Sequence, residues 1–427
     1  MVENPDGWVL IISPRKGLVV ELSTDLRDPS HSLGLGLELY QGIDVFRPGT
    51  GGFTRIASAS TVLESLAATG EAIASLRYLK LVVLEDLEIL DAEYELAVSI
   101  LRLRCDGLPV RFVGLSASLN DSADLATWLQ VDSPALHSFR PTDRDQSFTI
   151  IPKTFTTPFS PALYKATAKP THSAIAFHPE QPVIIFVPSR NHCHTVAMSL
   201  VTECALRDLN NVRGFVPPHV DQNALEFHLA KLQDRSILDF LSKGIGFYHD
   251  RVSKKDRSLI LQMYVEGVVR VLIVPRYSCW TLPVRAGVVI IMGTQYVVAG
   301  TGKSDRQVRD YELEEIARMQ GRAIRPDLDG RLYLFCHPDA KDTYLRFLNE
   351  GLPLESSLLD EGSLIVDWVQ RSRRGGGAPI GDDALKREVH RILSWTFLNR
   401  RIASNPVYYD IERGGGDALW QAVERVL

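Results

Sequence analysis

The sequence predicts an α/β protein built on two parallel β-sheets, and three observations support this fold class. Short apolar runs rich in Val and Ile recur along the chain. Each run is continuous rather than alternating, which is typical of strands covered on both faces. Segments with helical periodicity separate the runs, and this alternation predicts a parallel sheet with right-handed crossovers. The pattern occurs in two blocks, so we expect domains at residues 1–135 and 181–350.

The individual elements follow in chain order. Buried strands are predicted at residues 7–13, 80–87, 110–118, 182–189, 270–275, 286–293 and 331–337. Helices are predicted at residues 93–104, at residues 122–129 after a capping Asp121, and at residues 191–207. Residues 136–180 contain a stretch rich in Pro and Thr, which indicates a connection between the two domains.

The last segment, residues 351–427, is expected to begin a small helical domain that is not complete within the chain. One face of an expected helix is formed by Leu385, Val389, Ile392, Leu393 and Thr396. Asn405 and Pro406 are expected to end this helix. The RSRRGGGAPIG stretch that precedes it is expected to be a flexible, solvated linker.

The composition is that of a soluble globular protein. The 427 residues are 45% hydrophobic and 23% charged, and 47 Lys and Arg stand against 52 Asp and Glu. This mildly acidic balance argues against nucleic-acid binding driven by net charge alone.

The 5 cysteines are scattered, so neither a zinc site nor a disulfide framework is predicted and a reducing compartment is expected. No apolar run approaches the ~18 residues of a membrane span, and the first residues lack a signal-peptide pattern, so no membrane is expected as a partner.

The stretch VVAGTGKSD contains Gly302, Lys303 and Ser304, which resemble the end of a phosphate-binding loop. A working loop has the form GxxxxGK[ST] between a strand and a helix, so that backbone N–H groups surround the phosphates. Its first Gly would stand at position 297, which is Val297. We therefore interpret the stretch as a surface loop, and the pattern occurs nowhere else in the sequence.

Two arginines in the stretch ARMQGRAIRP indicate phosphate contacts of another kind. Arg322 and Arg325 stand between an expected helix and a buried strand, and their guanidinium groups suit bidentate contacts to phosphate oxygens. The stretch resembles the last motif of the superfamily 2 RNA helicases, with its GRAGRP loop and arginine finger. The run Ser116, Ala117 and Ser118 resembles the family's Ser-Ala-Thr motif, which couples ATP hydrolysis to strand movement.

The order of these motifs, from about Trp8 to Ile411, is similar to the C-terminal cassette of large two-cassette helicases of the Ski-type DExH-box family. The resemblance implies two RecA-like domains, the first N-terminally incomplete and without a phosphate loop, and then the start of a winged-helix domain at residues 351–427. It also implies loops that face an RNA backbone, which contain Pro14, Arg15, Lys16, Ser58 and Thr61 in the first domain and Arg190 and Tyr277 in the second.

The acidic motif departs from the family pattern. Family members have Asp-Glu-x-His here; the Asp holds Mg²⁺ through water and the Glu positions the attacking water. The aligned residues are Glu85, Asp86, Leu87 and Glu88, so the acids are exchanged and the His is lost. The exchange moves each carboxylate by about 1 Å, which can lower a rate roughly 100-fold. A solvated loop without a role is the alternative interpretation of these acids.

Other motifs are also altered. Thr281 replaces the Gly of a Trp-Gly step, Arg318 replaces a Gln, and Ile324 replaces a Gly of the last motif. Only His249 remains of the family's His-His-x-Gly-Leu run, within FYHDRV. Both arginines of the last motif are retained, but an arginine finger without a phosphate loop stabilises no transition state.

Two functional hypotheses stay open. The first is a degenerate cassette that is catalytically inactive as it stands and acts as a protein-interaction and regulatory module in pre-mRNA splicing. Its implied partners are spliceosomal proteins and a catalytic helicase cassette, and its implied location is the nucleus. The alternative is part of an active ATP-dependent RNA helicase, in which ATP and Mg²⁺ bind only together with an upstream segment that carries the phosphate loop. RNA is a candidate partner under both hypotheses, and no metal ligands are assigned.

Overall fold

The computed structural model describes residues 7–40, 42, 44–47, 53–68, 74–207, 213–299, 306–325, 329–373, 381–411 and 418–427. The chain divides into two compact units. Unit 1 comprises Met1–Pro141 and Glu350–Leu427, and unit 2 comprises Thr142–Asn349. Each unit is built on a fully parallel sheet, which confirms the predicted α/β fold class.

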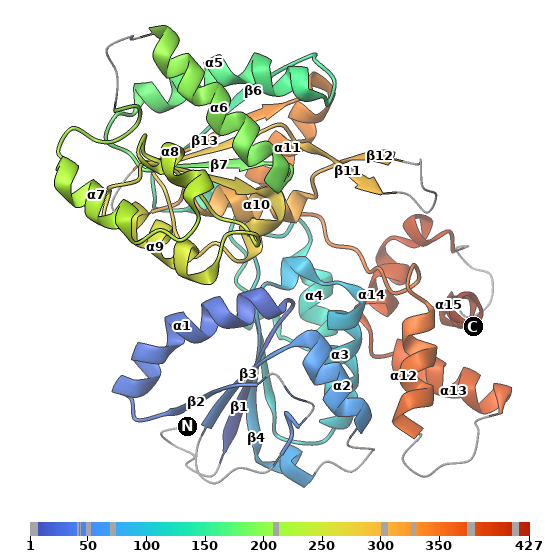
Figure 1. The fold of residues 1–427 in the computed structure, drawn as a ribbon. Coiled ribbons are helices and arrows are strands. Elements are labelled where there is room, and N and C mark those ends of the chain that lie inside the picture. Colours follow the sequence, from blue (N-terminus) through green and yellow to red (C-terminus); the bar gives the residue numbers. More distant parts are fainter. Residues whose placement is uncertain are drawn as a thin grey trace. The chain divides into compact units, whose positions relative to one another are not determined.

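The sheet of unit 1 has five strands in the order β2-β3-β1-β4-β5. They are β1 (Trp8–Ser13), β2 (Gly36–Leu39), β3 (Phe53–Ser58), β4 (Leu79–Leu84) and β5 (Arg111–Gly114). Helix α1 (Lys16–Ser32) covers one face, where Val19 packs with Val9, Ile11 and Ile56. Helices α2 (Ala59–Ala68) and α3 (Ala92–Arg104) lie on the opposite face (Figure 1). The central position of β1 accounts for its continuous apolar sequence, because both of its faces are buried.

The C-terminal helices are part of unit 1. They are α12 (Ser363–Arg373), α13 (Asp382–Leu393), α14 (Phe397–Ser404) and α15 (Ala418–Val426). The indole N–H of Trp368 donates to the carbonyl of Leu63 in α2 at 3.2 Å. Trp128, the last residue of α4 (Ser122–Trp128), donates to the carbonyl of Trp395 at 2.8 Å. These contacts join the C-terminal helices to the helices that cover the sheet, and a winged-helix arrangement stays a prediction.

The helix expected near residue 390 is two helices. α13 ends at Leu393 and α14 begins at Phe397. Between them Thr396 has an extended backbone, and its hydroxyl accepts the N–H of Asn399 at 3.4 Å, so it acts as the N-cap of α14. The predicted apolar face is present in α13, where the buried residues are Val389, Ile392 and Leu393.

The sheet of unit 2 has six strands in the order β6-β13-β10-β7-β9-β8. They are β6 (Phe148–Thr154), β7 (Val183–Val187), β8 (Ile245–Phe247), β9 (Val271–Pro275), β10 (Val288–Met292) and β13 (Gly330–Cys336). Its helices are α5 (Pro161–Phe177), α6 (Arg190–Arg207), α7 (Gln222–Ala230), α8 (Leu238–Leu241), α9 (Lys254–Val265), α10 (Leu313–Gly321) and α11 (Pro338–Glu350). The segment expected as a connection, residues 136–180, supplies both β6 and α5.

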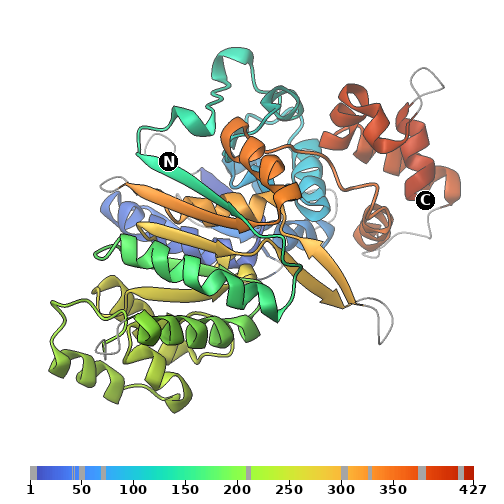
Figure 2. The ribbon, with the colours of Figure 1, turned by 90° about the horizontal axis from the view of Figure 1, so that it is seen from above.

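An antiparallel ribbon extends from unit 2. It consists of β11 (Gln295–Ala299) and β12 (Arg306–Asp310), and Figure 2 shows it projecting beyond the strands of the parallel sheet. Gly302, Lys303 and Ser304, the letters that resemble a phosphate loop, lie outside the described residues. Across the part of the chain that the structure describes, no helix combines the length and apolar character of a membrane span.

Candidate functional site

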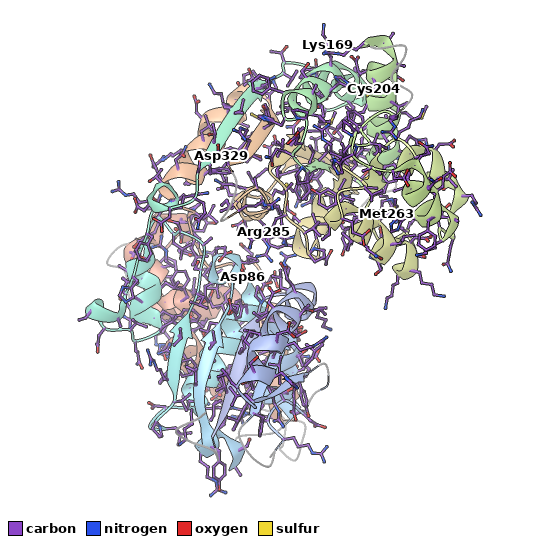
Figure 3. The ribbon with its side chains drawn as sticks, turned by 90° about the vertical axis from the view of Figure 1, so that its left-hand side faces the viewer. Asp86, Lys169, Cys204, Met263, Arg285 and Asp329 are labelled. Carbon is purple, nitrogen blue, oxygen red and sulfur yellow. The ribbon has the colours of Figure 1, made fainter. Side chains whose placement is uncertain are left out.

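The acidic motif of unit 1, residues 85–88, directly follows strand β4. The N–H of Glu85 donates to the carbonyl of Ile12 at 2.9 Å, which holds the end of β4 against the end of β1. Asp86 has a left-handed backbone with φ 52°, a conformation that Asp adopts more readily than most residues. Figure 3 labels Asp86 at the end of the unit 1 strands. The turn therefore carries both acids to the carboxyl edge of the sheet, where open α/β folds bind ligands.

Glu88 links this acidic turn to the run Ser116, Ala117 and Ser118. The side chain of Glu88 is 8% exposed. Its Oε2 accepts the N–H of Ala117 at 2.9 Å and the hydroxyl of Ser116 at 3.2 Å. Because β4 and β5 are neighbours, the loops after them meet at one edge of the sheet. The carboxylate therefore organises the loop that contains Ser116, Ala117 and Ser118, the coupling-motif loop.

Burial and mutual repulsion act on these carboxyl groups. Burial, followed by the charges of Asp86 and Glu88, raises the pKa of Glu85. Burial and the charge of Asp86 raise the pKa of Glu88, and the hydrogen bonds from Ala117 and Ser116 partly oppose this increase. Among the described residues, no group of three or more His, Cys, Asp or Glu is arranged to hold a metal ion. The turn thus concentrates acidic groups at the carboxyl edge of the sheet.

The coupling-motif loop also contacts the C-terminal segment of unit 1. Ser118 accepts the N–H of Leu352 at 2.8 Å through its backbone carbonyl, and the N–H of Asn120 donates to the carbonyl of Leu352 at 2.9 Å. These bonds form a parallel bridge between Leu119 and Leu352. The hydroxyl of Ser118 donates to the carbonyl of Phe139 at 2.5 Å. The loop is therefore held on both sides by segments distant in sequence.

Arg401 of α14 completes this connection. Its Nη1 donates to Asp124 at 2.5 Å and to Asp121 at 3.1 Å, and its Nη2 donates to Glu355 at 2.5 Å. The side chain of Arg401 is 9% exposed. Asp121 was expected to cap α4, but it makes no capping hydrogen bond and pairs with Arg401 instead. The C-terminal helices are thus joined by charged groups to the helix that follows the coupling-motif loop.

The RNA-contact candidates of unit 1 occupy two loops. Pro14 is buried, whereas Arg15 and Lys16 are exposed at the start of α1. Ser58 and Thr61 are buried at the start of α2, where their hydroxyl oxygens lie 2.8 Å apart. Because β1 and β3 are paired strands, the two loops follow adjacent strand ends. The exposed positive charges in this pair of loops are Arg15 and Lys16, and RNA contacts at these residues stay a prediction.

The two RNA-contact candidates of unit 2 share one carboxylate. Asp250 accepts the hydroxyl of Tyr277 at Oδ1, at 2.6 Å, and Nη1 of Arg190 at Oδ2, at 3.4 Å. Asp250 lies in the FYHDRV run, directly after His249. Burial lowers the pKa of His249, so this imidazole is neutral at physiological pH. The partners of Asp250 stand 60 and 27 residues away in the chain, so the sequence gives no signal of this arrangement and the fold is needed to find it.

The arginines of the last motif have different environments. Arg322 is 5% exposed, and its Nη2 donates to the carbonyl of Cys279 at 3.3 Å. Arg325 is partly exposed. Between them the carbonyl of Ile324 accepts Nη1 of Arg285, a residue labelled in Figure 3, at 2.9 Å. The loop is therefore fixed to the segment that follows β9, with Arg325 the more accessible guanidinium group.

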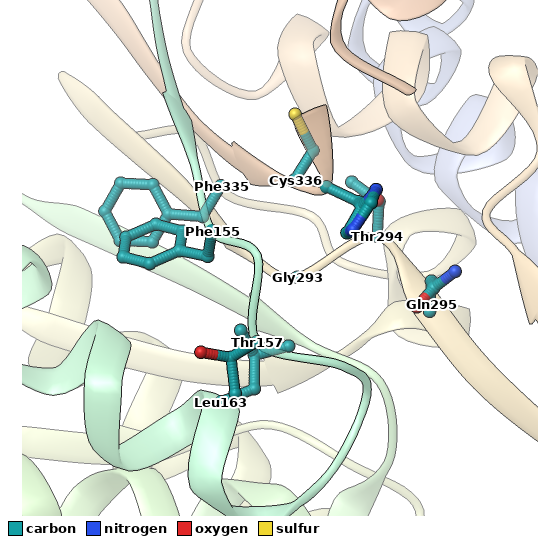
Figure 4. A pocket seen from close by; sticks show the side chains of 9 residues that line it. Phe155, Thr157, Leu163, Gly293, Thr294, Gln295, Phe335 and Cys336 are labelled. Atoms are coloured by element: carbon teal, nitrogen blue, oxygen red, sulfur yellow. The ribbon is translucent and has the colours of Figure 1, made fainter. Parts of the chain in front are cut away.

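A small pocket opens at the carboxyl ends of β6, β10 and β13 in unit 2 (Figure 4). It encloses about 320 Å³ of space, including its open mouth, and is lined by Phe155, Thr157, Leu163, Gly293, Thr294, Gln295, Phe335, Cys336 and His337. Burial raises the pKa of Cys336 to about 11, so its thiol is protonated and weakly nucleophilic at neutral pH. The lining contains none of the site residues predicted from the sequence.

Comparisons with known proteins agree with the fold. The two parallel-sheet α/β units are consistent with the RecA-like domains of RNA helicases. The chain is 33% identical over 326 residues to the human U5 small nuclear ribonucleoprotein 200 kDa helicase, a stretch that covers 75% of this chain and 14% of that protein. It is 32% identical over 322 residues to human activating signal cointegrator 1 complex subunit 3, again covering 75% of this chain and 14% of the relative.

A plant relative gives a similar match. Over 356 residues the chain is 32% identical to the DExH-box ATP-dependent RNA helicase DExH14 of Arabidopsis thaliana, which covers 81% of this chain and 16% of the relative. No protein-family model matches the chain. The chain therefore belongs to the Ski2-like DExH-box RNA helicases, and the matches are consistent with part of one helicase cassette. It spans about one seventh of the length of the relatives it matches, 14% for the human proteins.

Proposed function

We propose that the chain is a degenerate helicase cassette that is catalytically inactive as it stands and regulates a catalytic partner cassette. The contact between Glu88 and the coupling-motif loop carries this proposal. Glu88 stands at the position of the family's His, and its carboxylate is engaged by Ala117 and Ser116. The neighbouring acids, Glu85 and Asp86, are exchanged relative to the family order. The turn supports the loop mechanically while its carboxylates are poorly arranged for water activation.

We further propose that the module works in pre-mRNA splicing, in the nucleus, with spliceosomal proteins as partners. The name of its human relative, the U5 small nuclear ribonucleoprotein 200 kDa helicase, supports this assignment. The C-terminal helices support a regulatory role, because Arg401 and Leu352 join them to the segment containing the coupling motif. A partner that binds these helices would therefore act on the same loop.

RNA is the proposed nucleic-acid partner. Arg15 and Lys16 in unit 1 and Arg190 and Tyr277 in unit 2 have exposed or partly exposed side chains at strand ends. Contacts from such residues to phosphates position an RNA strand but carry no sequence information. We therefore expect weak binding of single-stranded RNA without sequence preference.

An active ATP-dependent helicase is the second candidate function. The retained Arg325 favours it, because a partly exposed guanidinium group can stabilise negative charge on a transferred phosphoryl group. The exchange of the acids Glu85 and Asp86 and the loss of the family's His oppose it. The second candidate predicts RNA-stimulated ATP hydrolysis by this cassette when it is joined to an upstream phosphate loop. The first candidate predicts no hydrolysis by it.

Titration of a catalytic cassette tests the regulatory role. Increasing amounts of the folded protein are added to a purified, active Ski2-like cassette, and RNA-stimulated ATP hydrolysis by that cassette is measured. The proposal predicts a saturable change of at least about twofold, equivalent to roughly 0.4 kcal/mol. Heat-unfolded protein is the control. An unchanged rate at all ratios, with direct binding also undetected by calorimetry, contradicts the proposal.

A further inference from the structure

Three loops of unit 2 meet around Asp250. The strands β7, β9 and β8 are neighbours in the parallel sheet. Arg190 begins α6 shortly after β7, Tyr277 lies in the 3-10 turn Arg276–Trp280 after β9, and Asp250 follows β8. Parallel strands present their carboxyl ends at the same edge of a sheet. The topology therefore places these three side chains together, although they are far apart in sequence.

The contacts of Asp250 are those that a phosphate group would make. One carboxylate oxygen accepts the Tyr277 hydroxyl at 2.6 Å, and the other accepts Arg190 at 3.4 Å. A carboxylate and a phosphodiester each present two anionic acceptor oxygens on one central atom. Arginine and tyrosine are frequent donors to nucleic-acid phosphates. The same two donors can therefore bind either Asp250 or an RNA phosphate.

The partners of Asp250 favour its anionic form. The hydrogen bond from Tyr277 lowers the pKa of Asp250, and the positive charge of Arg190 lowers it further. Exposed basic residues follow closely in the sequence, at Arg251, Lys254 and Lys255. An exposed anion in a basic surrounding competes with a polyanion for the same donors.

We propose that Asp250 is an internal substitute for an RNA phosphate, which holds Arg190 and Tyr277 in a binding geometry and lowers the affinity of unit 2 for single-stranded RNA. This inference rests on the proposed RNA contacts of Arg190 and Tyr277. All three side chains are at least partly exposed, and exposed ion pairs are weak. An RNA strand can therefore displace the carboxylate, at a cost in affinity.

Removal of the charge at Asp250 tests the proposal directly. Binding of fluorescein-labelled oligouridine to the whole protein is measured by fluorescence anisotropy at fixed salt. Asp250→Asn is expected to raise the affinity about two- to fivefold, the upper part of the range of an exposed ion pair. Glu180→Gln is the matched control, because exposed Glu180 lies before the amino end of β7 and loses the same charge. That control is expected to leave the affinity nearly unchanged. Circular dichroism checks that each variant is folded.

A double-mutant cycle separates local competition from a general change in charge. The gain from Asp250→Asn is expected to disappear when Arg190→Ala and Tyr277→Phe are introduced together. An equal gain in that background, an equal gain from Glu180→Gln, or no gain at all overturns the proposal. An oligodeoxythymidine probe should show the same gain, because the competition concerns phosphate and not the 2′-hydroxyl.

The result also distinguishes this inference from the proposed RNA contacts on which it rests. If Arg190→Ala and Tyr277→Phe lower the affinity but Asp250→Asn does not raise it, only the role of Asp250 is wrong. If neither substitution alters the affinity in the Asp250→Asn background, the RNA contacts themselves are wrong. If neither the natural protein nor Asp250→Asn binds RNA, both proposals fail.

Discussion

The carboxylate of Glu88 accepts the backbone N–H of Ala117 at 2.9 Å. This contact joins the acidic turn after β4 to the loop after β5. The last acid of this turn supports the coupling-motif loop, because it also accepts the hydroxyl of Ser116. The same loop is joined on its other side to Leu352, so it connects the acidic turn with the C-terminal helices of unit 1.

Loss of the Glu88 carboxylate should loosen the coupling-motif loop. Glu88→Ala leaves the N–H of Ala117, an exposed residue, without its protein acceptor, and the loss of one such hydrogen bond costs about 0.5–1.5 kcal/mol. We expect faster hydrogen exchange at the Ala117 amide, measured by NMR or mass spectrometry. Glu88→Gln keeps an acceptor oxygen and should show a smaller increase. Unchanged exchange at Ala117 in the alanine variant contradicts the assigned contact.

A second carboxyl group makes the stability of unit 1 depend on pH. Glu95 is fully buried in α3 and accepts the N–H of Leu398 at 2.7 Å. Burial raises the pKa of Glu95 from its ordinary value of 4.5 to about 7, although hydrogen bonds from Ser356, Leu398 and Phe397 oppose this increase. The folded state therefore binds an extra proton between these two pH values. Its stability is highest below pH 4.5 with respect to this group, and it falls as the pH rises to about 7.

Glu95→Gln should remove this dependence. At pH 8 the variant is expected to exceed the natural protein in unfolding free energy by up to about 3 kcal/mol, since each pKa unit corresponds to about 1.4 kcal/mol. At pH 5 the difference should be small. Urea unfolding followed by tryptophan fluorescence measures both values, and exposed Glu424→Gln in α15 is the control. A variant that is equally or less stable at pH 8 disproves the assignment.

Arg401 should be essential for docking of the C-terminal helices. Arg401→Met leaves the carboxylates of Asp124 and Glu355 without their shared cation, and breaking a buried ion pair costs about 3 kcal/mol or more. Arg400→Met changes an exposed neighbour with the same charge and should stay within about 0.5 kcal/mol. The tryptophans at positions 128 and 395 report the loss, because they are hydrogen-bonded across this contact. Equal unfolding midpoints for the two variants would argue against the ion network.

Lys16 provides a test of RNA contacts in unit 1. If its exposed ammonium group contacts a phosphate, Lys16→Ala should weaken binding of every single-stranded sequence alike. The slope of log affinity against log salt should also fall by about 0.7, the value for one phosphate contact on a single strand. Exposed Lys386→Ala in α13 is the charge-matched control. Identical slopes for both variants and the natural protein exclude a contact at Lys16.

Most strands in the middle of each sheet could be predicted because their sequences are continuous apolar runs. Those that escaped prediction lack this signal. β6 and β8 are edge strands, and β6 contains Pro152, which a sheet tolerates at its edge. β3 is buried but contains Arg55, whose guanidinium group donates to Glu38 and to the carbonyls of Val45 and Arg47. Arg55 lowers the mean hydropathy of β3, so this buried strand does not stand out as an apolar run.

The candidate site was only partly predictable for a related reason. The motif residues are local signals, so Glu85, Asp86 and Arg325 could be found from the sequence. Their partners come from distant segments: Arg401 meets Asp121 across 280 residues, and Glu95 meets Leu398 across 303 residues. Such pairs follow from packing and not from spacing. Asp250 is the exception, since its position in FYHDRV was visible but its significance needed the fold.

RNA-stimulated ATP hydrolysis by the folded protein tests the central claim most directly. The measurement is made on this chain and on a form extended upstream to include a GxxxxGK[ST] loop, each compared with its Arg325→Ala variant at saturating single-stranded RNA. We predict no hydrolysis above background for either form and no effect of Arg325→Ala. RNA-dependent hydrolysis that Arg325→Ala abolishes would contradict the claim that this cassette is inactive, and would make the chain part of a working helicase.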